Sequence, residues 1–134
     1  MSEQTMPAHG SFCWSELAST NVEAAKKFYS QLLGWELKEG EVAPMIYTEI
    51  MAGGKPVGGM YQMTPEDGDR PSHWMAYVAV DDVEASAKRV EELGGKICVP
   101  PSDIPNVGRF CVITDPSGAS LSLVTLTGHL NQPH

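Results

Sequence analysis

The chain has 134 residues, 42% of them hydrophobic, which suits one compact domain or two small modules that share a core. Its formal net charge of −8 argues against binding to nucleic acid or to an anionic membrane, because both partners require a basic surface. No segment approaches the roughly 18 apolar residues of a membrane span, the N-terminus lacks signal-peptide regions, and the three cysteines form no CxxC pair, so we expect a reduced, cytoplasmic protein.

The first half of the chain predicts a strand, a helix and three more strands. A strand is expected at 11–17, and Thr20 with Glu23 three positions later has the spacing of a capping box at a helix start. Gly34 is expected to end the helix. The predicted buried face of this helix consists of Ala25, Phe28, Tyr29, Leu32 and Leu33. The three strand-like segments that follow are WELKEG, MIYTEIMA and PVGGMYQM.

The second half repeats this order after a linker at 64–72 that is polar and contains Pro and Gly. A strand is expected at 73–80, and Asp81 with Glu84 three positions later predicts the start of a second helix that ends at Gly94. The letters VEA occur at 22–24 and again at 83–85. The later strands are expected in KICVP, GRFCVIT and GASLSLVTL.

The repeated order predicts an α+β protein with two tandem βαβββ modules, at 10–63 and 73–127, inside one domain. One face of each module's sheet is covered by its own helix, and the other face needs a cover if it is apolar. We therefore expect the two modules to form a curved mixed sheet around a cavity. The length of the linker allows the modules to pair within one chain or between two chains.

These segments resemble the vicinal oxygen chelate superfamily, which includes glyoxalase I, bleomycin-resistance proteins and extradiol dioxygenases. The resemblance is carried by ASTNVEAAKKFYSQLLGW, by VAVDDVEASAKRVEELGG and by the closing hairpin GRFCVITDPSGASLSLV. It implies the fold just described and a homodimer. It does not by itself imply one activity, because a fold of this kind hosts many functions.

Metal-dependent members of the superfamily hold their ion with His, Gln or Glu on the first strand and Glu on the last strand of each module. The resemblance places these positions at Trp14, Met75 and Ser122, and at Gly58, or Gly59 if the register differs by one. The indole of Trp, the thioether of Met and the hydroxyl of Ser are poor ligands for hard or borderline divalent ions, and Gly has no side chain to offer. We therefore expect no functional metal and no cofactor.

Strand alternation predicts which other side chains face the cavity. Together with the four positions above, the expected ligand-binding set includes Met60 and Tyr77, and Arg109 is placed at the rim, where it either meets an anionic group or is simply solvated. Glu16 and His73 are the candidate catalytic residues, Glu16 as a base and His73 as an acid or a base. The alternatives are a structural hydrogen bond or salt bridge for Glu16 and a half-exposed strand end for His73.

Three functions remain open on these residues. The first is a metal-free module that binds a small apolar or aromatic molecule in the cavity. The second is a lyase or isomerase related to lactoylglutathione lyase, which uses Glu16 and His73 or a metal site at other positions. The third is a structural dimer whose cavity is filled by its own side chains.

Overall fold

The computed structural model describes residues 7–42, 45–65, 68–104 and 107–126. It contains eight strands and two helices, which confirms the α+β class. The chain divides into two compact units: a first unit, Trp14–Met75, and a second unit, Met1–Cys13 with Ala76–His134. The module boundaries at 10–63 and 73–127 stay predictions. Neither helix in the described part of the chain has the length and apolarity needed to cross a membrane.

The first unit contains most of β1 (Phe12–Ser19), then α1 (Val22–Leu33), β2 (Glu36–Val42), β3 (Met45–Ala52) and β4 (Lys55–Gln62). Its strands lie in the order β2-β3-β4-β1. The pairs β2–β3 and β3–β4 are antiparallel, whereas β1 and β4 run parallel. The parallel pair arises because α1 and two strands separate β1 from β4 in the chain.

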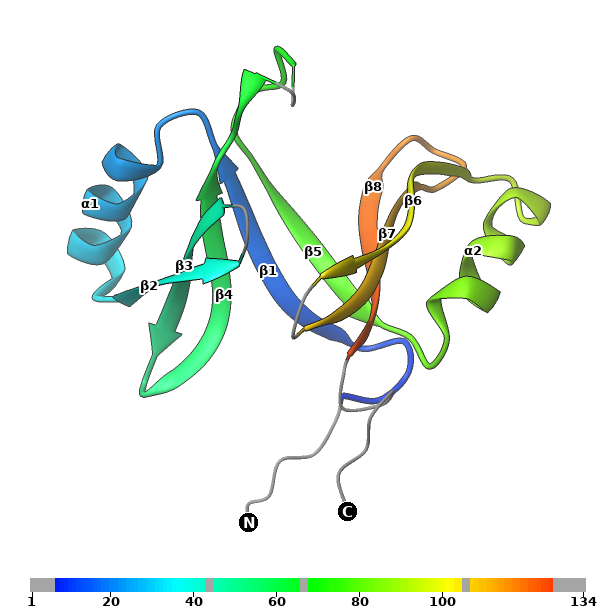
Figure 1. Ribbon diagram of the computed structural model, residues 1–134, viewed down its shortest axis with the longest axis horizontal. Helices are drawn as coiled ribbons and strands as arrows, with labels where there is room; N and C mark the ends of the chain where they lie inside the picture. Colours follow the sequence, from blue (N-terminus) through cyan, green and yellow to red (C-terminus); the bar gives the residue numbers. More distant parts are fainter. Residues whose placement is uncertain (1–6, 43–44, 66–67, 105–106, 127–134) are drawn as a thin grey trace. The chain divides into compact units, whose positions relative to one another are not determined.

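The second unit repeats this arrangement. It contains most of β5 (His73–Ala79), then α2 (Val83–Glu92), β6 (Lys96–Ile104), β7 (Gly108–Thr114) and β8 (Ser120–Leu126). Its strands lie in the order β5-β8-β7-β6, again with the first and last strands parallel. The predicted order of strand, helix and three strands is therefore confirmed in both halves (Figure 1).

Both helices begin one residue later than expected. The side chain of Asn21 caps α1 by accepting a hydrogen bond from the backbone N–H of Ala24, and Asp82 caps α2 in the same way for Glu84 and Ala85. Thr20 instead contacts Ser72 through its backbone N–H and its hydroxyl. Both residues of each Thr-Asn or Asp-Asp pair are good caps by residue type, so the tertiary contacts decide which of the two caps the helix.

Each unit has a small core between its helix and one face of its sheet. In the first unit Leu17, Ile50 and Met60 are buried, and the α1 residues that pack against them are Val22, Ala25 and Tyr29. In the second unit the buried cluster consists of Val80, Val83, Cys111 and Leu123.

The prediction that one face of α1 is buried is wrong for three of its five residues. Phe28, Leu32 and Leu33 are 57%, 62% and 52% exposed. The helix contacts its core through a narrow stripe that contains Ala25 and Tyr29, and Phe28 and Leu32 lie to one side of it. Leu33 is the last residue of the helix.

Gly58 is required where β4 approaches β1. A Cβ atom at this position would lie 2.4 Å from the backbone carbonyl oxygen of Ser15, which is far inside van der Waals contact. We predict that Gly58→Ala lowers the free energy of unfolding by about 1–3 kcal/mol, as overpacking does.

The matched control is Gly40→Ala in β2, where a Cβ atom meets nothing within 4 Å. This change should stay within about 0.5 kcal/mol of the parent protein. Urea denaturation followed by circular dichroism measures both variants. Equal stabilities for the two variants would contradict the close approach of β4 to β1.

Candidate functional site

The candidate site is built on the face of the first unit's sheet that α1 does not cover. In β1, Leu17 points to the core under α1, so Trp14 and Glu16 point to the opposite, helix-free face. Tyr47 of β3 joins them. Its hydroxyl accepts a hydrogen bond from Trp14 Nε1 at 2.9 Å and donates one to Glu16 Oε2 at 2.8 Å.

Tyr47 reaches β1 because β4 carries no side chain in its path. In the ladder, Glu16 pairs with Gly59, so position 59 belongs to the helix-free face. A Cβ atom on Gly59 would lie 2.0 Å from the Tyr47 hydroxyl oxygen. The phenol therefore occupies the place that a side chain at position 59 would take.

This register corrects two expectations. Gly58 pairs with Ser15 and Met60 pairs with Leu17, so both lie on the face under α1 rather than on the helix-free face. Met60 is fully buried in the core there. The counterpart of the superfamily's last-strand Glu in the first module is thus Gly59. The two adjacent glycines carry no side chain that could mark which of them points to which face.

The environment of Tyr47 keeps its hydroxyl protonated. Burial raises the pKa of Tyr47 far above its usual value, and the negative charge of Glu16 raises it further. The hydrogen bond from Trp14 acts in the opposite direction, and the charge of Glu49 adds a smaller increase to the pKa. The phenol consequently acts as a neutral donor to Glu16 instead of becoming an anionic ligand.

His73 and Met75 of β5 alternate with Trp74, which packs against the α1 residue Tyr29. They therefore point to the helix-free side. Nδ1 of His73 lies 2.8 Å from the backbone oxygen of Pro71, and Nε2 lies 3.4 Å from a guanidinium nitrogen of Arg70. Both ring nitrogens of His73 thus contact the segment that precedes its own strand.

In the second unit, described by itself, the expected ligand-binding residues are Tyr77 and Ser122. They are paired across β5 and β8, and both are buried. The neighbouring residue Leu123 belongs to the core under α2, so Tyr77 and Ser122 face the helix-free side. The Ser122 hydroxyl has no hydrogen-bond partner among the described residues. Ser122 pairs with Tyr77 as Gly59 pairs with Glu16, which makes positions 59 and 122 equivalent in the two units.

Arg109 is not placed as expected. Its neighbour Cys111, two residues on, is buried under α2, so the side chain of Arg109 lies on the α2 side. There its guanidinium binds Glu84 at 2.6 Å and Asp103 at 2.9 Å. Hydrogen bonds to Glu84 and then Asp103 raise the pKa of Arg109. Two carboxylates already compensate the charge of this guanidinium, which argues against a role in binding an anionic ligand.

With the register of β4, the resemblance to metal-dependent members of the superfamily places the metal positions at Trp14, Gly59, Met75 and Ser122. None of these residues offers the carboxylate or imidazole that nickel, zinc, iron or manganese prefers. Across the described residues, no three His, Cys, Asp or Glu side chains are grouped so that they could share an ion. The residues present therefore do not fit the metal site of the superfamily.

Sequence reasoning missed Tyr47, which organises the first unit's face. Two signals were available. The alternation in MIYTEIMA places Tyr47 and Glu49 on one side of the strand, and the pair Gly58–Gly59 inside a strand indicates that another group approaches closely.

The collision between Tyr47 and position 59 predicts a coupled pair of mutations. Gly59→Ala should cost about 2 kcal/mol or more in the parent protein, because its Cβ atom meets the phenol. In a Tyr47→Ala background the same change should cost less than about 1 kcal/mol, because the ring is gone. Urea denaturation of the four proteins gives the coupling free energy, and additive effects would place Tyr47 away from Gly59.

The raised pKa of Tyr47 predicts a loss of stability in alkali. An unfolded tyrosine ionises near pH 10, whereas folded Tyr47 keeps its proton, so above about pH 10 the unfolded state binds fewer protons than the folded state. The free energy of unfolding should therefore fall by up to about 1.4 kcal/mol per pH unit more steeply in the parent protein than in Tyr47→Phe. Urea titrations between pH 8 and pH 11 measure both slopes, and parallel curves would contradict the burial of this phenol.

Comparisons with known proteins agree with this architecture. The family model for the Glyoxalase/Bleomycin resistance protein/Dioxygenase superfamily matches residues 12–123. A Mycobacterium tuberculosis protein named "Putative glyoxylase CFP32" is 38% identical over 116 residues, which are 86% of this chain and 44% of the relative. The anthracycline biosynthesis protein DnrV of Streptomyces peucetius is 31% identical over 129 residues, covering 87% of this chain and 47% of its own. The chain thus spans about half the length of these curated relatives.

Solved structures show the same fold at low sequence identity. Methylmalonyl-CoA epimerase from Mycobacterium tuberculosis superimposes with a TM-score of 0.62 at 16% identity, over 91% of this chain and 93% of its own. The Mn(II)-bound glyoxalase from Novosphingobium aromaticivorans has a TM-score of 0.58 at 21% identity, over 85% of this chain and 38% of its own. From its repeated units and the family match over residues 12–123, the chain belongs to the glyoxalase/bleomycin resistance protein/dioxygenase superfamily.

Proposed function

We propose that this protein is a metal-independent binding module that holds a small, largely apolar or aromatic molecule on a helix-free sheet face. The observation that carries the proposal is the position of Tyr47. Its ring fills the place where a metal-dependent relative would carry a carboxylate, and its hydroxyl is held between Trp14 and Glu16.

The chemistry of the remaining side chains supports this class of ligand. Trp14, Met75 and Tyr77 present indole, thioether and phenol surfaces, which suit an apolar or aromatic molecule. Ser122 offers a buried hydroxyl that has no partner within the described chain, and a ligand oxygen would satisfy it. The name of the relative DnrV points the same way, since anthracyclines are polycyclic aromatic compounds.

The names of the mycobacterial relatives favour a second candidate, an enzyme of the glyoxalase type. In that reading Glu16 acts as the base and His73 as an acid or a base. The contacts of both residues support a structural role instead, because Tyr47 donates to Glu16 and the His73 ring nitrogens lie against Pro71 and Arg70. A proton-transfer activity that disappears in Glu16→Gln would favour the enzyme. The homodimer, the cytoplasmic location and the cavity between the modules stay predictions.

Metal independence and ligand binding are tested together. The purified protein should contain far less than one nickel, zinc, iron or manganese ion per chain by elemental analysis, and EDTA should leave its Tm unchanged. A thermal-shift screen of small aromatic compounds should raise the Tm in proportion to the logarithm of ligand concentration. About one ion per chain, lost in Glu16→Ala or His73→Ala, would contradict the proposal and favour the enzyme.

A further inference from the structure

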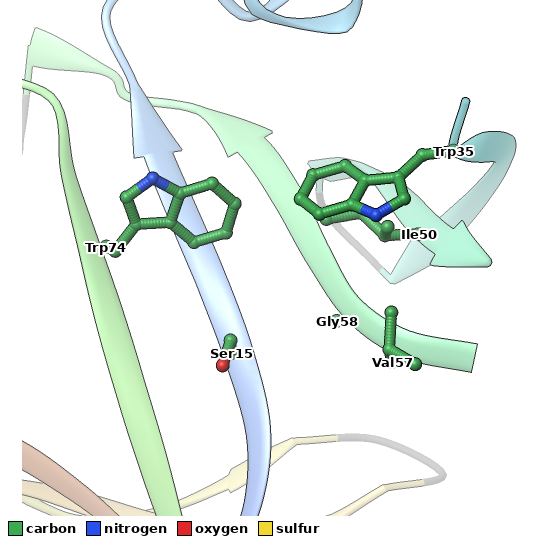
Figure 2. A pocket seen from close by; sticks show the side chains of 6 residues that line it. All are labelled: Ser15, Trp35, Ile50, Val57, Gly58 and Trp74. Atoms are coloured by element: carbon green, nitrogen blue, oxygen red, sulfur yellow. The ribbon is translucent and has the colours of Figure 1, made fainter. Parts of the chain in front are cut away.

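A small pocket opens on the other face of the first unit, on the side of the sheet that carries α1 (Figure 2). Its volume is about 190 Å³. Figure 2 shows the indole rings of Trp35 and Trp74 together with side chains from the three neighbouring strands β1, β3 and β4. The lining residues are Ser15, Trp35, Ile50, Val57, Gly58 and Trp74.

The bottom of the pocket is open because β4 provides no side chain there to fill it. Gly58 faces this side of the sheet and cannot carry a side chain, since a Cβ atom would collide with the backbone of Ser15. Val57 is an extra residue in the ladder, because Ile50 pairs with Gly58 whereas Met51 pairs with Pro56. The bulge takes one residue out of the regular alternation directly beside the glycine.

The aromatic walls are held in place by their neighbours. The Trp35 ring stacks on Tyr29 with centroids 5.4 Å apart, and Trp74 meets both rings nearly edge-on, at 5.6 Å from Tyr29 and 6.2 Å from Trp35. Trp74 Nε1 also donates to the Tyr29 hydroxyl at 3.3 Å. Trp74 nevertheless remains 43% exposed, so a bound molecule would remove apolar indole surface from water without reorganising the walls.

We propose that this pocket is a second ligand site that accepts one neutral aromatic ring of the size of a phenol. The size follows from the volume, because a cavity of about 150 Å³ accommodates benzene whereas drug-sized ligands need about 300 Å³ or more. The ligand is expected to be neutral because none of the residues that line the pocket is charged. The Ser15 hydroxyl and the indole nitrogen of Trp35, which Figure 2 shows on the side of the ring toward Val57, provide polar partners for one substituent.

This site goes beyond the proposed function and is independent of it. Trp14, Glu16 and Tyr47 lie on the opposite face of the same sheet, so a ligand held there does not touch Trp35 or Trp74. The pocket is also too small for a polycyclic molecule. Either site can therefore be disproved without affecting the other.

The test uses 4-fluorophenol with the full chain, observed by ¹⁹F NMR. We expect saturable broadening of the probe signal that is displaced by unlabelled phenol. Ser15→Leu places an apolar side chain over the floor, and Trp74→Ala removes one wall. Each variant should weaken binding by about tenfold or more, equivalent to about 1.4 kcal/mol.

Phe28→Ala is the matched control, because Phe28 is an exposed aromatic beside Tyr29 that does not line the pocket. It should leave binding of the probe within about twofold of the parent protein. Ser15 is an exposed residue, so the filled variant is expected to fold even if Trp74→Ala does not. The proposal is overturned if 4-fluorophenol does not bind at millimolar concentration. It is also overturned if binding survives both Ser15→Leu and Trp74→Ala, or is lost in Trp14→Phe alone.

Discussion

The position of one phenol ring governs the chemistry of the first unit. Tyr47 extends from β3 across β4 to β1, and it does so in the space that any side chain at position 59 would need. Its hydroxyl then connects Trp14 with Glu16. This arrangement couples three strands through one half-buried group, and it holds only while position 59 is glycine and the phenol keeps its proton.

The two adjacent glycines of β4 act on opposite faces of the sheet. Gly59 leaves room for Tyr47 on the helix-free face, where a polar contact replaces a carboxylate position of metal-dependent relatives. Gly58 lets β4 approach β1 on the α1 face and leaves the space beneath Trp35 and Trp74 open. A pair of residues without side chains thus shapes both faces of this sheet, because it admits the Tyr47 ring on one face and leaves a pocket on the other.

The repeated order of elements and the α+β class could be predicted from the sequence, because capping residues, glycine helix ends and hydrophobic periodicity occur in both halves. The strand register of β4 could not, since two glycines give no alternation to count and the bulge at Val57 shifts the pairing. Exposed Phe28 and Leu32 show a further limit, because helical spacing identifies an apolar stripe but not how much of it meets the sheet. The sequence left Arg109 open between an anionic ligand and solvent, and it could not indicate Glu84 of α2, a partner that only folding brings near.

The Trp14 side chain donates a hydrogen bond to the protonated phenol of Tyr47. The indole N–H signals of Trp14, Trp35 and Trp74 can be assigned in a ¹H–¹⁵N spectrum with single Trp→Phe variants. We expect the Trp14 N–H to exchange with water more slowly than that of Trp35, and we expect Tyr47→Phe to move the Trp14 signal and to remove its protection. A Trp14 N–H that exchanges like an exposed indole and does not respond to Tyr47→Phe would contradict the hydrogen bond between Trp14 and Tyr47.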